Sequence, residues 1–112
     1  MKILNSSIHG IVDYLVVIFL VLSPSIFALS ETGAQYCYIL AGVHLGLTIL
    51  TNFKYGIIKV IPFPVHGIIE YIVGAALIIS PFILNYDGVD KTFYIGFGIA
   101  VLVTALVTNY KS

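Results

Sequence analysis

The sequence predicts an all-α fold: a transmembrane four-helix bundle built from two tandem helical hairpins, related by a pseudo-twofold axis along the membrane normal. Three observations predict it. The chain is 60% hydrophobic and 9% charged, with a mean hydropathy of +1.10. Residues 8–29 and 65–86 share a sequence pattern, which indicates a duplication. The apolar residues gather in four long runs, at about 8–29, 34–53, 65–86 and 92–109.

Each run is long enough to cross a bilayer as a helix, because about 20 residues rising about 1.5 Å each span the hydrocarbon. Backbone polar groups in lipid need internal hydrogen bonds, so a spanning segment is a helix or part of a closed barrel. The runs lack the polar alternation that is typical of barrel strands. We therefore expect the lipid bilayer as a partner and one domain over residues 1–112, divided into repeats 1–56 and 57–112.

The placement of charges predicts the orientation. One side of the membrane carries most of the basic residues: Lys2, Lys54, Lys59 and Lys111. The other side carries Lys91 beside three carboxylates. The positive-inside rule then puts both termini and the middle connection in the cytoplasm.

The duplication extends over both hairpins. Residues 8–29 read IHGIVDYLVVIFLVLSPSIFAL, and residues 65–86 read VHGIIEYIVGAALIISPFILNY. The second and fourth runs match more weakly, but TNFK at 51–54 corresponds to TNYK at 108–111. Two spans per repeat preserve orientation, which predicts a parallel repeat with the first and third helices at equal depth.

One motif therefore occurs twice at matched positions: HGIVDY followed by SPS at 23–25, and HGIIEY followed by SPF at 80–82. This pattern resembles the SPW-repeat family of small bacterial integral membrane proteins, over nearly the whole chain. The chain has no tryptophan, so Ser25 and Phe82 stand where the family motif has one. The resemblance implies a two-repeat, four-helix protein of the bacterial inner membrane, and it implies no settled activity.

A histidine and a carboxylate recur four residues apart, as His9 with Asp13 and His66 with Glu70. Residues at i and i+4 share a helix face. Ionisable groups within membrane helices are costly, which favours a functional role. Two pairs at equal depth could form a four-ligand metal site. They could equally hold a proton, with each carboxylate setting the charge and tautomer of its histidine.

The same pairs also have a structural interpretation. Both histidines fall near the start of their runs, where they could anchor the helices at the membrane interface. Ser7 is a natural N-cap for the first helix, and Pro64 suits the first turn of the third. The duplication does not decide, because repeating a structural device also repeats its residues.

His44, in the middle of the second run, has no counterpart, because Ala100 or Val101 stands there. A polar stripe around it could line a pocket leading towards Asp13. The alternative is an ordinary hydrogen bond to a neighbouring helix. The stripe comprises Cys37, His44, Thr48 and Thr51.

Small and helix-breaking residues mark two further features. Gly42 and Gly46 form a G-x-x-x-G pattern that predicts close packing with another helix, of this chain or of a second copy. Ser-Pro pairs late in the first and third runs predict kinks or helix ends; the alternative is a broken helix whose freed carbonyls bind a cation. These pairs are Ser23, Pro24, Ser80 and Pro81.

Three function classes fit these residues. The first is binding or translocation of a proton, small cation or small ligand through the two pairs, with His44. The second is a metal- or haem-binding bundle with His9 and His66 as ligands. The third is an accessory subunit that packs on another membrane protein. A catalytic motif is not evident, and basic residues are too few for nucleic acid.

Each class makes a different structural prediction. Transport predicts a polar cavity that reaches His44 from the cytoplasmic side. A metal site predicts that the His9 and His66 side chains face each other. An accessory role predicts that both histidines face headgroups.

Overall fold

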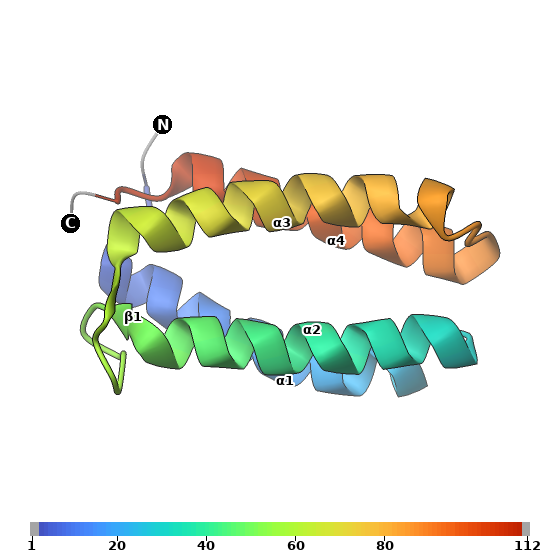
Figure 1. The fold of residues 1–112 in the computed structure, drawn as a ribbon, viewed down its shortest axis with the longest axis horizontal. Helices are drawn as coiled ribbons and strands as arrows, with labels where there is room; N and C mark the ends of the chain where they lie inside the picture. The colour runs from blue at the N-terminus through green and yellow to red at the C-terminus, as the bar shows by residue number, and fades with distance from the viewer. Residues whose placement is uncertain (1–2, 111–112) are drawn as a thin grey trace.

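The computed structural model describes residues 3–110, and these form an all-α bundle of two helical hairpins (Figure 1). All four helices of this part are long and apolar enough to span a membrane. The fold class predicted from the sequence is confirmed. Lys2 and Lys111, on which the predicted orientation partly depends, lie outside the described residues. The helices are α1 (Ser6–Ile26), α2 (Glu31–Leu50), α3 (Phe63–Ile83) and α4 (Gly88–Val107).

The helices begin two to four residues earlier than the apolar runs, and side-chain caps mark the starts of α1 and α2. The Asn5 side chain caps α1 by accepting a hydrogen bond of 2.9 Å from the Ile8 amide. The prediction of Ser7 as N-cap is therefore wrong, and Ser7 lies in the first turn. Pro64 occupies the first turn of α3, as predicted.

The Ser-Pro pairs lie inside α1 and α3, close to their C-terminal ends. Proline leaves the carbonyl four residues earlier without its helical donor. The Leu20 carbonyl instead accepts from Cys37 Sγ at 3.1 Å, and the Leu77 carbonyl accepts from Ser80 Oγ at 3.3 Å. Since side chains already satisfy both carbonyls, the geometry favours helix ends over cation ligands.

The ends of the repeats exchange contacts at one end of the bundle. Strand β1 (Thr51–Asn52) pairs in parallel with β2 (Ile61–Pro62), with Thr51 opposite Ile61. Leu4 forms a parallel bridge to Thr108. Residues 4 and 61 are equivalent at the repeat offset, as are 51 and 108. The start of each repeat thus pairs with the end of the other, as pseudo-twofold symmetry requires.

Both described termini and the middle connection lie at this same end (Figure 1). We call it the terminal end, and the end with the two hairpin turns the turn end. At the turn end a buried apolar core joins all four helices. Its fully buried members are Leu20, Cys37, Ala41, Leu77 and Tyr94.

Large apolar side chains cover the outer faces of every helix. Ile39 and Ile72 are each 64% exposed, for example, and Ile18 is 56% exposed. Such a surface fits lipid, and the chain is an integral membrane protein by the length and composition of its helices.

An added Cβ at Gly42 or Gly46 meets nothing within 4 Å. These two glycines therefore do not mediate close packing between helices of this chain. Packing against a second copy or another membrane protein stays a prediction.

Candidate functional site

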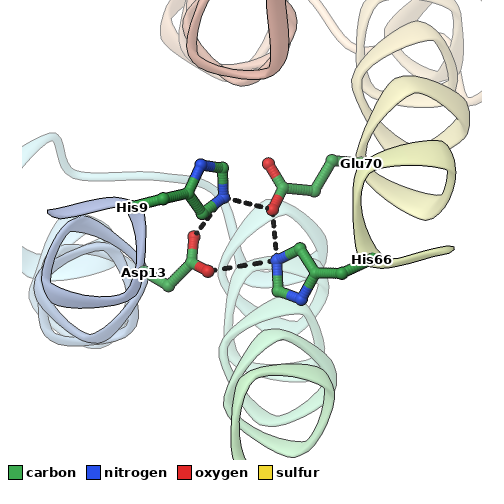
Figure 2. A group of neighbouring side chains, drawn as sticks. All are labelled: His9, Asp13, His66 and Glu70. Carbon is green, nitrogen blue, oxygen red and sulfur yellow. Dashed lines mark hydrogen bonds and ion pairs between the residues drawn. The ribbon is translucent and has the colours of Figure 1, made fainter. Parts of the chain in front are cut away.

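The side chains of the two repeated pairs converge near the terminal end of the bundle (Figure 2). His9 and Asp13 come from α1, and His66 and Glu70 come from α3. One nitrogen or oxygen atom from each lies within 4.8 Å of all the others. We call these four residues the cluster. The sequence predicted all four, and the structure brings them together.

Each carboxylate in the cluster contacts both histidines. Asp13 lies 3.3 Å from His9 Nε2 through Oδ1 and 3.0 Å from His66 Nε2 through Oδ2. Glu70 Oε1 lies 2.7 Å from His9 Nε2 and also contacts His66 Nε2. Nitrogen and oxygen therefore alternate around one centre, with both Nε2 atoms directed inward.

The cluster is buried in protein. His9 and His66 are 0% exposed, Asp13 is 2% exposed and Glu70 is 4% exposed. This burial contradicts the interpretation of the histidines as anchors that face headgroups. Buried charges are costly unless they are paired or bind a cation, so the four groups must compensate one another or hold a cation.

Two threonines fix the outward nitrogens of the histidine rings. His9 Nδ1 lies 2.7 Å from Thr108 Oγ1, and His66 Nδ1 lies 2.6 Å from Thr51 Oγ1. Both contacts cross the repeat boundary. They follow from the exchanged strand pairing, which holds the end of each repeat beside the first turns of the other.

The threonine hydroxyls also determine which ring nitrogen carries the proton. Each hydroxyl has one hydrogen. Thr51 donates it to the Leu47 carbonyl at 2.6 Å, and Thr108 donates it to the Thr104 carbonyl at 2.6 Å. Each threonine oxygen must then accept from a histidine Nδ1–H. A neutral histidine in this position directs an Nε2 lone pair at the carboxylates.

Aromatic rings close the cluster at the terminal end. Phe63 lies 5.5 Å from His9 and 4.9 Å from Tyr110, between ring centroids. A Cβ at Gly10 would collide with the Phe53 ring, and one at Gly67 would come within 2.6 Å of the Tyr110 ring. The glycine after each histidine thus makes room for the aromatic residue of TNFK or TNYK.

Burial raises the pKa of the Tyr110 phenol, and the charge of Glu70 raises it further. The phenol therefore stays neutral over the physiological range.

His44 lies beside the cluster. Its Nε2 atom is 3.4 Å from Asp13 Oδ1, and its side chain is 18% exposed. The sequence pattern placed His44 on a polar stripe leading towards Asp13, and His44 does lie next to Asp13. The rest of the polar stripe does not form a path. The Thr48 hydroxyl donates a hydrogen bond of 2.8 Å to the His44 carbonyl, and the Cys37 thiol donates one to the Leu20 carbonyl.

Three atoms at the centre lack a well-oriented hydrogen-bond partner among the described residues: Asp13 Oδ2, His44 Nε2 and His66 Nε2. Unsatisfied buried polar atoms are rare and call for an explanation such as an ion.

A carboxylate at the turn end behaves differently. Asp90 is 6% exposed, and it accepts hydrogen bonds from the Ser30 amide at 2.9 Å and from the Ser30 hydroxyl. Ordinary donors therefore satisfy Asp90, whereas the partners of the cluster carboxylates among residues 3–110 are histidines.

Sequence reasoning missed the role of Thr51 and Thr108 as histidine partners. The repetition of TNFK as TNYK was the available signal.

Comparison with known families gives a match over nearly the whole chain. The family described as the SPW repeat domain matches residues 7–108. The chain belongs to the SPW repeat family. The match includes both histidine–carboxylate pairs, both threonines and His44, so the SPW repeat domain of this chain contains the whole cluster. Neither a search of curated proteins nor a search of solved structures found a match.

The haem interpretation fits this SPW repeat domain poorly. A haem iron with two histidine ligands needs room for the porphyrin ring around it. Here carboxylate oxygens lie within 3.3 Å of His9 Nε2 and occupy that space.

The transport interpretation requires a polar entrance. The main cavity beside the cluster has a volume of about 420 Å³, but only His44 and Glu70 give it polar walls. Aromatic rings cover the cluster on the side of the termini. A polar route from that side is not found within residues 3–110.

Proposed function

We propose that this SPW repeat protein binds a divalent transition-metal ion at His9, Asp13, His66 and Glu70. The observation that carries the proposal is the pair of threonine contacts. They hold each Nδ1 as the protonated nitrogen, which leaves both Nε2 lone pairs for a ligand at the centre. Metal-binding histidines typically donate their other ring N–H in this way.

Charge balance supports the same proposal. Two ionised carboxylates with two neutral histidines carry a charge of about −2 in a buried site. Such a charge is unstable away from water. A divalent cation neutralises it without a proton on either Nε2 atom.

The donor set indicates which ions would fit. Two imidazole nitrogens and two carboxylate oxygens suit Zn²⁺, Mn²⁺ or Fe²⁺. With metal–ligand bonds of about 2.0–2.2 Å, neighbouring donor atoms lie about 3.0–3.5 Å apart. The contacts of 3.0 and 3.3 Å within the cluster already have that spacing, and the 2.7 Å contact of His9 with Glu70 needs a small outward movement to reach it.

Proton binding is the second candidate. The 2.7 Å separation of His9 Nε2 and Glu70 Oε1 is a hydrogen-bond distance, and such a bond would need a proton on Nε2. Two imidazolium rings would also neutralise the carboxylates. For a metal ion and for a proton alike, burial of the cluster and the aromatic rings over it favour stable binding over transport.

Metal analysis tests the proposal. The protein is purified in mild detergent without chelator, incubated with Zn²⁺, Mn²⁺ or Fe²⁺, desalted and analysed for metal per chain. We expect about one ion per chain in the wild type, as for a single closed site. Asp13→Asn should abolish binding. Asp90→Asn is the matched control, because it alters a buried carboxylate outside the cluster and should retain the ion.

Folding of both variants is checked by gel filtration and circular dichroism. A wild type that retains none of the three ions would contradict metal binding and favour the proton site.

A further inference from the structure

A cavity of about 420 Å³ lies between the two hairpins, next to the cluster. All four helices contribute to its walls, and the side chains are apolar except for His44 and Glu70. This volume falls in the range of pockets for small molecules, about 300–1,000 Å³. The walls have the usual composition of such pockets, mostly apolar with a few polar groups in one place.

The two repeats differ in the residues around this cavity. The crevice at the equivalent depth, next to Asp13 and Ala100, holds about 50 Å³, and a separate cavity of about 330 Å³ lies between α1 and α4 nearer the turn end. Gly46 lines the large cavity. At the repeat offset its counterpart is Val103, or Leu102 by the alternative alignment. The wall position that is glycine in the first repeat therefore carries a larger side chain in the second.

The bilayer is the route into this cavity. Its lining residues on α2 and α3 lie within the membrane-spanning parts of those helices, and one of them, Val43, is 58% exposed. The terminal end is covered by Phe53, Phe63 and Tyr110. A molecule that reaches the cavity laterally must dissolve in lipid.

The two polar groups in the wall indicate the head group of that molecule. Glu70 contacts both histidines through Oε1, which leaves Oε2 for another partner. A carboxylate oxygen accepts hydrogen bonds and repels anions. The imidazole of His44 forms the adjoining wall. A hydroxyl group can donate to Glu70 and also bond to His44, whereas a fatty-acid carboxylate would be repelled.

We infer that this cavity binds an apolar molecule with a hydroxyl head, such as a long-chain alcohol, which enters from the bilayer and places its hydroxyl between His44 and Glu70. The inference goes beyond the proposed metal site and does not require that site to be occupied.

Photolabelling in lipid nanodiscs tests the inference. The probe is a sixteen-carbon alcohol with a diazirine in its chain, and labelled peptides are mapped by mass spectrometry. We expect the label to concentrate on the cavity-lining parts of α2 and α3. Unlabelled 1-hexadecanol should compete for this labelling, while hexadecane and palmitate at neutral pH should not. Even labelling over all lipid-facing helices, or equal competition by the alkane, would overturn the inference.

Two glycine variants sharpen the test. Gly46→Leu fills the cavity, and Gly42→Leu is the matched control on the same helix, since neither position meets a neighbour within 4 Å and only Gly46 lines the cavity. We expect Gly46→Leu to lose labelling of the cavity peptides at least about fivefold and Gly42→Leu to keep it. His44→Leu should weaken competition by the alcohol about fivefold to tenfold, through loss of a hydrogen bond. Equal labelling of Gly46→Leu and Gly42→Leu would contradict a bound ligand in the cavity.

Metal content measured on the same samples separates the two proposals. Gly46→Leu should keep its metal while it loses the label. Specific labelling of a protein that binds no metal would support the cavity inference and contradict the proposed metal site. Bound metal without specific labelling would support the metal site and contradict the cavity inference.

Discussion

In the first repeat, His9 contributes to the cluster and is held by Thr108 at 2.7 Å; in the second, His66 is held by Thr51 at 2.6 Å. These positions correspond one to one. Along α2 and α4 the correspondence ends, because the counterpart of His44 is apolar and the counterpart of Gly46 is larger. The shared features build one site that needs both halves. The divergent features line the 420 Å³ cavity beside it, so the two kinds of residue should respond differently to mutation.

The largest effect should come from the cluster histidines. His9→Ala and His66→Ala should each weaken metal binding at least about 100-fold, beyond the usual cost of losing an outer partner, and by similar amounts because their roles are equivalent. The double variant should bind no metal and still fold, since the core at the turn end is untouched. Chelator competition measures affinity, and circular dichroism measures folding. A double variant that cannot be extracted as folded protein would make the cluster a structural element.

The threonines should come next. Thr51→Val and Thr108→Val remove the acceptors that fix the Nδ1 protons. Each should weaken metal binding about 10- to 100-fold, the usual cost of losing a partner of a metal-binding histidine. Thr104→Val is a suitable control, because the Thr104 hydroxyl donates to the Ala100 carbonyl in its own helix rather than contacting a cluster histidine. Similar losses in all three variants would argue against a specific role for the cross-repeat contacts.

The glycines behind the histidines should affect stability. Gly10→Ala and Gly67→Ala place a Cβ against the Phe53 and Tyr110 rings, and overpacking of this kind typically costs about 1 to 3 kcal/mol. Gly42→Ala, with open space around it, should be neutral or stabilising. Thermal unfolding in detergent compares the three. If Gly42→Ala destabilises as much as the others, the aromatic cover is not the cause.

His44 should matter less to the metal than the duplicated residues. It contacts Asp13 at 3.4 Å without a counterpart in the second repeat. His44→Ala should weaken metal binding less than about tenfold, as expected for loss of one hydrogen-bond partner. Chelator competition again provides the measurement. A loss as large as that of His66→Ala would make His44 a direct ligand and the site less symmetric than proposed.

The smallest effect should appear in the pH dependence of stability. Tyr110 and Phe53 are equivalent, but only Tyr110 titrates. Its raised folded pKa means that its contribution to stability is complete below the unfolded value of about 10 and falls as the pH rises above it. The difference in unfolding free energy between wild type and Tyr110→Phe should therefore decrease above about pH 10. A difference that stays constant with pH would contradict burial of the phenol.

Much of the fold follows from local patterns in the sequence. The apolar runs predicted the four helices, and the repeated HGxx(D/E)Y motif predicted that His9 and His66 would lie at equal depth. The helix starts were harder, because Asn5 rather than Ser7 makes the capping bond. The choice between adjacent polar residues depends on backbone geometry that composition does not reveal.

Long-range features were the least predictable. Thr51 meets His66 only because the repeats exchange their end segments, and two-residue strands carry no detectable pattern. The cavity depends on how the hairpins pack around Gly46, which the sequence suggested only as a helix-packing residue. The repetition of TNFK marked the threonines without revealing their partners.

The exchange of end segments also places the first and last described residues side by side. The Ile3 amide donates to the Val107 carbonyl at 2.7 Å, and the Asn109 amide donates to the Leu4 carbonyl at 2.7 Å. Adjacent ends of this kind favour circular permutation. A chain opened in the connection between β1 and β2, with its present ends joined by a short linker, would carry the repeats in reverse order. It would retain every contact of the cluster, because each half already supplies what the other lacks.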